Sequence, residues 1–141
     1  MAAVDDAIYV SDIELQRIWK VPTAGGEPVE FAVIAAVRGM AAAEDGSLRI
    51  ATGLRPNVAK VSADGTVTPI LDEGKFAFTN QLALGKDGTT YVADGYAKSI
   101  WKVTEAGAAE ALVAGEPFVN PVGLAWRGDD LLVVDPRANG V

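Results

Sequence analysis

One sequence pattern of about 41 residues occurs four times along the chain and constrains its fold more than any other feature. In each copy a first apolar segment and a polar turn lead to a second apolar segment that ends at an anchor residue. The four anchors are Asp12, Thr52, Asp94 and Asp135, which stand 40, 42 and 41 residues apart. Repeats of this length are typical of propellers and solenoids, in which each copy is one supersecondary unit that packs against its neighbours.

The second half of the pattern repeats as closely as the first half. Six residues after each anchor stands a β-branched residue, namely Ile18, Val58, Ile100 or Val141. In the first three copies a polar turn with glycine follows, and then another apolar segment. Each full copy therefore predicts four short β-strands, and no segment has apolar residues at helical spacing over a sufficient length.

Asp-Gly pairs mark three of the turns, at Asp45-Gly46, Asp64-Gly65 and Asp87-Gly88. Asp and Gly tolerate the positive φ angles of tight hairpins, so these pairs predict antiparallel strand pairs. Four antiparallel strands per repeat make one propeller blade. The predicted fold class is all-β, an open arc of about three and a half four-stranded β-propeller blades from a six- or seven-bladed ring. A β-solenoid is the alternative, although its coils usually repeat over fewer residues.

The repeat predicts a single partial propeller domain over residues 1–141. Its blades fall at approximately 1–38, 39–79 and 80–121, with a half blade at 122–141. Residues 1–12 already supply the first two strands of blade one and cannot donate a third and fourth strand to the half blade, so we expect that a homodimer of this chain would not close neatly. We therefore expect a piece of a larger ring. The alternative is self-association through the open blade edges, because exposed sheet edges and faces are costly.

Two long phrases, GLAWRGDDLLVVDPRANGV and LALGKDGTTYVADGYAKSIWKV, resemble the NHL-type repeat. They are equally similar to the six-bladed propellers of the regucalcin and gluconolactonase family and to the streptogramin lyase group. The resemblance covers nearly the whole chain and implies a propeller fold. It does not imply one function, because such blades serve as binding platforms, sensors, hydrolases and lyases.

The composition excludes several classes of partner. The net charge of −7 repels phosphate backbones and anionic membrane surfaces, so neither nucleic acid nor a membrane is an expected partner. The longest apolar run, 31–37, is far shorter than the roughly 20 residues of a membrane-spanning helix. The first ten residues, MAAVDDAIYV, show no signal peptide, and the absence of cysteine leaves the compartment open.

The chain contains no histidine. Histidine is the commonest general base and a common metal ligand, so its absence restricts the chemistry open to this chain. The lyases that resemble this repeat rely on histidine, and the resemblance therefore implies that their activities cannot reside in this segment. No catalytic residue is predicted.

A ligand is expected at the end of the blades where strand one begins and strand two ends. Arg38, Asn80 and Val122 start their strands there, beside the loops that follow the anchors, and loops vary where strands repeat. Arg55 lies in the most divergent loop and, with Arg38, would form a small anion-recognising patch. The expected partner is a small molecule or a protein at this rim. The predicted rim residues are Arg38, Arg55, Asn57, Asn80 and Asn120.

Asn80 is the sharpest single candidate. Its sequence, TNQLAL, resembles the Asn-Gly-Leu-Ala of the regucalcin and gluconolactonase family, which implies a ligand for Ca²⁺ or another divalent cation. The equivalent Arg38 and Val122 donate no oxygen, whereas a hard cation takes six or more. The structural alternative is that Asn80 caps the start of its strand.

Other repeated residues are expected to be structural. Asp12, Asp94 and Asp135 recur in separate copies, so we expect them to accept hydrogen bonds from the loop after strand two. Trp19 and Trp101 share one position of the repeat, and we expect packing between blades rather than stacking on a ligand.

Two functions remain open from the sequence. The first is an NHL-like segment that acts as a binding platform for a ligand or a protein. The alternative is part of a divalent-metal-dependent hydrolase, similar to gluconolactonase and regucalcin, that acts on sugar lactones or esters.

Overall fold

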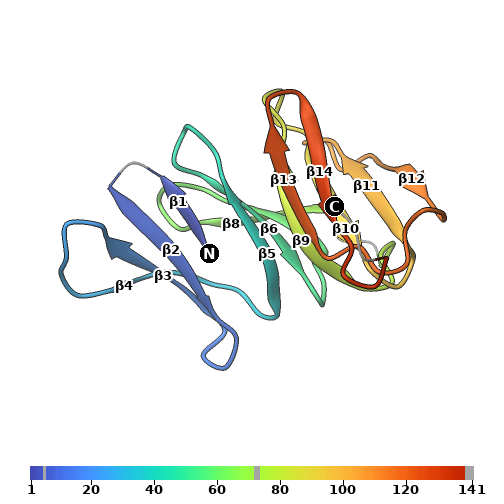
Figure 1. Cartoon of the computed structure of the whole chain (residues 1–141). Helices are drawn as coiled ribbons and strands as arrows, with labels where there is room; N and C mark the ends of the chain where they lie inside the picture. The colour runs from blue at the N-terminus through green and yellow to red at the C-terminus, as the bar shows by residue number, and fades with distance from the viewer. Residues whose placement is uncertain (5, 72–73, 139–141) are drawn as a thin grey trace.

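The computed structural model describes residues 1–4, 6–71 and 74–138 (Figure 1). Val141, which the repeat places in a third strand of the last blade, lies outside these residues. All regular secondary structure in the described residues is β-strand, in 14 strands. The described part of the chain holds no helix long and apolar enough to cross a membrane.

The strands form three four-stranded antiparallel sheets and one two-stranded sheet, each in simple chain order. The first sheet contains β1 (Ala2–Val4), β2 (Ala7–Asp12), β3 (Arg17–Pro22) and β4 (Val29–Val33). The second contains β5 (Val37–Ala42), β6 (Leu48–Thr52), β7 (Val58–Val61) and β8 (Val67–Leu71). The third contains β9 (Thr79–Leu84), β10 (Thr90–Asp94), β11 (Ser99–Val103) and β12 (Ala109–Ala114). The last sheet pairs β13 (Gly123–Arg127) with β14 (Asp130–Val134).

The sheets stand beside one another in an arc, as Figure 1 shows. The first strands of neighbouring sheets approach one another, β1 with β5, β5 with β9 and β9 with β13. These strands therefore lie along the inner edge of the arc. The chain is an open arc of β-propeller blades, and the predicted fold class is confirmed.

Side chains that alternate across each strand fill the spaces between the sheets. In β6, Ile50 packs in the apolar cluster between the first and second sheets, and its neighbour Ala51 packs in the cluster between the second and third sheets. Both side chains are fully buried. A sheet with a neighbour on each side buries both faces, which explains why β6 is buried along its whole length. A third cluster around Leu124 joins the third sheet to β13–β14.

The anchor aspartates have the structural role expected of them. Asp94 is fully buried, and its carboxylate accepts hydrogen bonds from the backbone N–H groups of Ala77 (2.7 Å), Phe78 (2.8 Å) and Ala97 (3.1 Å). The side chain thus ties the segment that leads into the third sheet to the loop between its second and third strands. Asp12 accepts one such bond, from Leu15 at 2.9 Å.

Asp135 repeats this arrangement in the last sheet. Its donors are the backbone N–H groups of Val119 (2.7 Å), Asn120 (2.9 Å), Arg137 (3.2 Å) and Ala138 (3.1 Å). Burial raises the pKa of this carboxyl group, but the four hydrogen bonds together lower it by more than burial raises it. The pKa therefore lies below its ordinary value.

The two tryptophans differ in their surroundings. Trp101 packs with the cluster between the second and third sheets, with its ring centroid 5.5 Å from that of Phe76. The expected packing between blades is confirmed for this residue. Trp19 lies on the outward side of the first sheet, in a shallow apolar hollow with Val10 and Val21.

Candidate functional site

The strand starts of three sheets meet around one hollow at the inner edge of the arc. This axial hollow has a volume of about 450 Å³ and is lined by Ile13, Val37, Arg38, Asn80, Gln81, Val122 and Gly123. The backbone N–H of Gln81 donates to the carbonyl of Val122 at 3.2 Å, which joins the starts of β9 and β13. The structure therefore brings Arg38, Asn80 and Val122 together at the end of the blades predicted from the sequence.

Arg38 is held in place by aromatic side chains. Its guanidinium carbon lies 4.8 Å from the ring centroid of Phe78, and the Phe78 ring stacks on Tyr96 at 4.7 Å and 26°. These three residues form the cation–aromatic stack. Such a contact stabilises a cation by about 0.5–2 kcal/mol while leaving its N–H groups open to a ligand. No carboxylate among the described residues forms an ion pair with Arg38.

Asn80 acts as a cap in the structure. Its side-chain Nδ2 donates to the carbonyl of Pro121 at 3.0 Å, which supports the structural alternative given above. A Cβ atom on Gly95 would lie 2.7 Å from this Nδ2 and 2.5 Å from Oδ1 of Asn120. The two asparagine side chains therefore converge over Gly95, where only glycine leaves room for both. One N–H of Nδ2 is engaged in this bond, and the Oδ1 of Asn80 is the acceptor that remains for a ligand.

Arg55 and Asn57 lie in the adjacent loop and do not line the axial hollow. Asn57 is only 7% exposed, and its Nδ2 donates to the carbonyl of Leu54 at 2.9 Å. The side chain of Asn57 therefore stabilises the loop through a hydrogen bond within it. Arg55 is exposed and lies beside Gly74, where a Cβ atom would be 3.4 Å from the guanidinium Nη2. The anion patch that combines Arg55 with Arg38 stays a prediction.

The donor atoms at the hollow do not fit a complete cation site. Ca²⁺ takes six to eight oxygens, most often from carboxylates and carbonyls. The lining residues include two side-chain amides, Asn80 and Gln81, and no carboxylate. Within residues 1–4, 6–71 and 74–138, no group of three or more His, Cys, Asp or Glu could hold a metal ion. The predicted metal role of Asn80 therefore gains no support from its neighbours.

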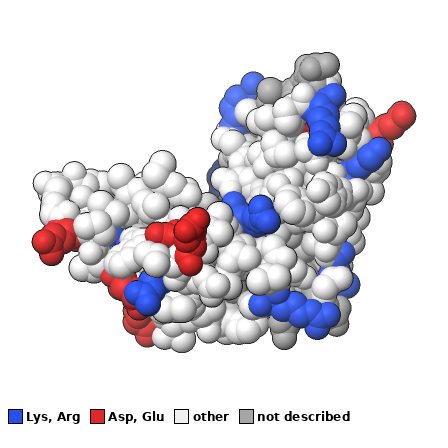
Figure 2. All heavy atoms as spheres, turned by 90° about the horizontal axis from the view of Figure 1, so that it is seen from below, with Lys and Arg blue, Asp and Glu red and all other residues white. Residues whose placement is uncertain are grey.

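Charge is unevenly distributed at this end of the molecule. Figure 2 views the arc from below, the side on which the loops after β2, β6 and β10 lie. Acidic side chains gather mainly over the first sheet, and basic side chains lie over the rest of the surface in this view. The surface away from the first sheet is therefore more favourable to an anion in this view than the net charge of −7 suggests.

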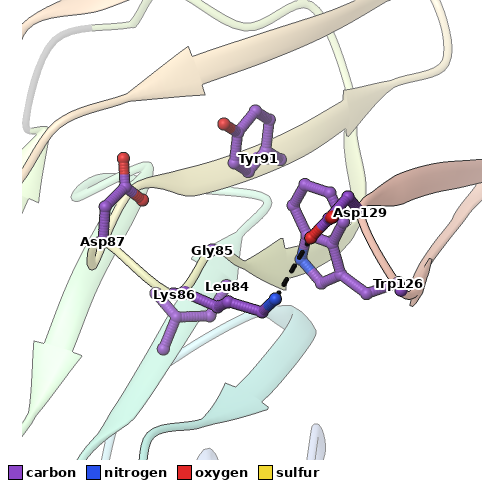
Figure 3. Close-up of a pocket in the computed structure, with 8 residues that line it drawn as sticks. Leu84, Gly85, Lys86, Asp87, Tyr91, Trp126 and Asp129 are labelled. Carbon is purple, nitrogen blue, oxygen red and sulfur yellow. Dashed lines mark hydrogen bonds and ion pairs between the residues drawn. The ribbon is translucent and has the colours of Figure 1, made fainter.

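A second hollow lies at the opposite end of the blades, between the third sheet and β13–β14 (Figure 3). It has a volume of about 380 Å³, and its aromatic wall is formed by Tyr91 and Trp126, whose ring centroids are 5.3 Å apart. At its mouth the ammonium group of Lys86 pairs with Asp129 at 3.1 Å. Because its cation already has a partner, this hollow offers less to a charged ligand than the axial hollow does.

Several residues of these hollows and of the contacts between sheets are not predicted from the sequence. Phe78 and Tyr96 were not predicted, although each is an aromatic residue close to a predicted rim residue or anchor. Arg49 was also missed: it is 3% exposed, forms an ion pair with Glu105, and leaves Nε and Nη1 buried without a partner among the described residues. Its partner is 56 residues away, so no local pattern reveals the pair.

No protein-family model and no curated protein sequence matches the chain. Solved structures do match it. A streptogramin B lyase structure has a TM-score of 0.79 and 21% identity, over 94% of this chain and 46% of that chain. A gluconolactonase from Xanthomonas campestris has a TM-score of 0.72 and 19% identity, over 92% of this chain and 50% of its own. A chain of a nidogen/laminin complex has a TM-score of 0.76 and 16% identity, over 94% and 54%.

These likenesses show the fold, a β-propeller, and the chain spans about half the length of each similar structure. Propellers with different functions match about equally well. Function has to be argued from the side chains of this chain.

Proposed function

We propose that this chain is a binding platform whose axial hollow takes a small anionic ligand with an apolar part. The observation that supports this proposal is the position of Arg38, which lines the hollow while its guanidinium group lies over Phe78, the ring on which Tyr96 stacks. The apolar walls come from Ile13, Val37 and Val122.

The chemistry of these groups suits a carboxylate. A guanidinium group binds a carboxylate through two parallel N–H donors, and this fork is stronger and more directional than a contact with an ammonium group. Because the aromatic stack already restricts the Arg38 side chain, less conformational entropy is lost when a ligand binds. The free Oδ1 of Asn80 is an acceptor for a hydroxyl or N–H group on the same ligand.

The experiment is a titration of the full chain with benzoate and cyclohexanecarboxylate, in which binding is monitored by the NMR chemical shifts of the backbone amides. We expect shifts at β5, β9 and the start of β13, and at least a tenfold weaker affinity in Arg38→Gln. Arg38→Lys should bind more weakly than the native chain because it loses the planar fork. Arg127→Gln is the matched control, since Arg127 is exposed and pairs with Asp130 at the other end of the blades.

Two results would contradict the proposal. One is binding that Arg38→Gln leaves unchanged. The other is a set of shifts confined to the hollow of Tyr91 and Trp126, which would move the site to the opposite end of the blades.

A second candidate is metal-dependent hydrolysis of sugar lactones or esters. The likeness to a gluconolactonase and the position of Asn80 at its strand start favour it. It ranks second because the lining residues offer no carboxylate to a cation. The test is hydrolysis of glucono-δ-lactone by the full chain with added Ca²⁺. Activity lost with a chelator and in Asn80→Ala would favour this candidate, and no activity above that of buffer would exclude it for this chain.

A further inference from the structure

The outward face of the first sheet is apolar and has no sheet beyond it among the described residues. Val10 of β2 pairs with Trp19 of β3, and two residues along the strands, on the same face, Ile8 pairs with Val21. Val10 is 37% exposed. Val10, Trp19 and Val21 line a hollow of about 470 Å³ with Leu15, Pro28 and one acidic residue, Asp12. We call this outward face the head face.

The third sheet shows how the same face behaves when a neighbour covers it. Val92, Trp101 and Val103 stand 82 residues after Val10, Trp19 and Val21, at the same positions of the repeat. They pack in the cluster between the second and third sheets, where Val92 and Val103 have no exposed surface. The head face therefore has the kind of side chains that pack against the preceding sheet elsewhere in this protein.

The sheet of β13 and β14 carries the matching face. In the second sheet, Gly39 pairs with Ala51 on the side that packs against the third sheet. In the last sheet Gly123 pairs with Val134, and Ala125 pairs with Leu132, in the same register. Val134 is 42% exposed. We call this side of β13–β14 the tail face.

The two glycines support this correspondence. A Cβ atom on Gly39 would lie 2.8 Å from backbone atoms of Asn80 and Leu82, so glycine is what allows β5 to approach β9. A Cβ atom on Gly123 would meet only Val134 of its own sheet. Gly123 thus keeps the close-approach position of an inner strand, although no described strand approaches it from that side.

We propose that two copies of this chain associate head to tail, with the tail face of each copy packed on the head face of the other. A contact between two different faces closes into a dimer only when each copy turns the ring by about half. Each copy carries four sheets in its described residues, so two copies joined in this way form a ring of eight sheets, the upper end of the four to eight blades typical of propellers.

The last sheet has two strands in the described residues, and this does not prevent the closure. Between neighbouring sheets, first and second strands lie close together, as β5 does with β9 and β10 with β13. Outer strands add contacts of their own, such as that of Gly65 with the carbonyl of Phe31 in β4. β13 and β14 are the first and second strands of their sheet. The expected difficulty with a homodimer concerns strand donation, and packing between faces does not require any strand to be donated.

Sedimentation velocity of the full 141-residue chain, over a hundredfold range of concentration, tests the proposal. We expect the native chain to have the mass of a dimer. Val10→Lys alters the head face and Val134→Glu alters the tail face. The dimer of each variant alone should therefore dissociate at concentrations at least tenfold higher than the native dimer does. Mixing the two variants should restore the dimer, because one contact then pairs the introduced lysine with the introduced glutamate and the other contact is native.

Val113→Lys is the matched control, since Val113 is also 42% exposed but lies on the outer strand β12. It should remain a dimer, and circular dichroism should show that all variants are folded. A folded native chain that is monomeric throughout would overturn the proposal, and would mean that another partner covers these faces or that they stay open. A dimer that Val10→Lys disrupts and mixing does not restore would also overturn it, because it would indicate contact between two head faces.

Discussion

At the scale of single residues, the buried anchor carboxylates make contacts that no neighbouring side chain can replace. Asp94 accepts three backbone hydrogen bonds in a fully buried position. We expect Asp94→Ala to lower the free energy of unfolding by about 3 kcal/mol, because buried N–H donors are then left without acceptors. Urea denaturation followed by circular dichroism measures the change.

Asp94→Asn is the control for this prediction. Asparagine has nearly the same shape and keeps one acceptor oxygen, so the loss should be clearly smaller than in Asp94→Ala. The second sheet already uses a neutral anchor, since Thr52 accepts from Leu54 N and donates to backbone carbonyls through its hydroxyl group. Equal losses in both Asp94 variants would show that charge, rather than hydrogen bonding, dominates.

Acid should destabilise the fold through Asp135. Its pKa in the folded chain is below the ordinary value of about 3.9, so folding favours the charged form. The resulting stability is fully present above about pH 4 and is lost as the pH falls through the folded pKa. Urea midpoints measured from pH 7 to pH 2.5 should be level at first and then fall, and the fall should be smaller in Asp135→Asn than in the native chain. A midpoint that rises on acidification would contradict this.

The residue scale also shows what a sequence can reveal about a site. The structural role of the anchors and the capping role of Asn80 follow from recurrence and position in the repeat. The cation–aromatic stack does not, because Arg38, Phe78 and Tyr96 come from three separate segments that only the packed arc brings together.

At the scale of strands and turns, the Asp-Gly pairs make each turn largely independent of its surroundings. The carboxylate of Asp45 accepts hydrogen bonds from the hydroxyl group and from the backbone N–H of Ser47. These bonds lower the pKa of Asp45, the bond from the hydroxyl group most. The backbone N–H of Thr89 is the main cause of the lowered pKa of Asp87. Such turns depend on neighbours in the sequence, which is why the strand pairs were predictable. Arg49 and Glu105 belong to different sheets, and their pairing was not.

The approach of β5 to β9 is one of the tight contacts between sheets that the glycines reveal. We expect Gly39→Ala to lower the free energy of unfolding by about 2 kcal/mol or more, because its Cβ would meet rigid backbone and the strands would have to separate. Thermal and urea unfolding measure the effect. In Gly53→Ala the new Cβ would meet only the flexible side chain of Arg38, at 3.1 Å, so this control should change stability little. Similar losses in both variants would refute the close-approach explanation.

At the scale of the whole molecule, the period of the repeat predicted an arc of blades because each blade must bury its faces against the next. The sequence cannot show how strongly successive sheets are joined, since this depends on side chains from both sides of each interface. The cluster between the first two sheets includes Ile18, Leu48 and Ile50. The cluster that joins the last sheet is smaller and rests on Leu124 against Ala83, Ala93 and Ile100.

The unequal clusters predict that the last sheet opens before the rest of the arc. Leu124→Ala should speed hydrogen exchange in β13 and β14 while leaving β6 protected, because it weakens only the smallest interface. Ile50→Ala removes a fully buried side chain between two full sheets and should lower the free energy of global unfolding by about 2–5 kcal/mol. Both variants are best measured by exchange with mass spectrometry in the Val134→Glu background and at low concentration, where the proposed self-association is weakened. Faster exchange in β6 of the Leu124→Ala variant would mean that the four sheets unfold as one cooperative unit.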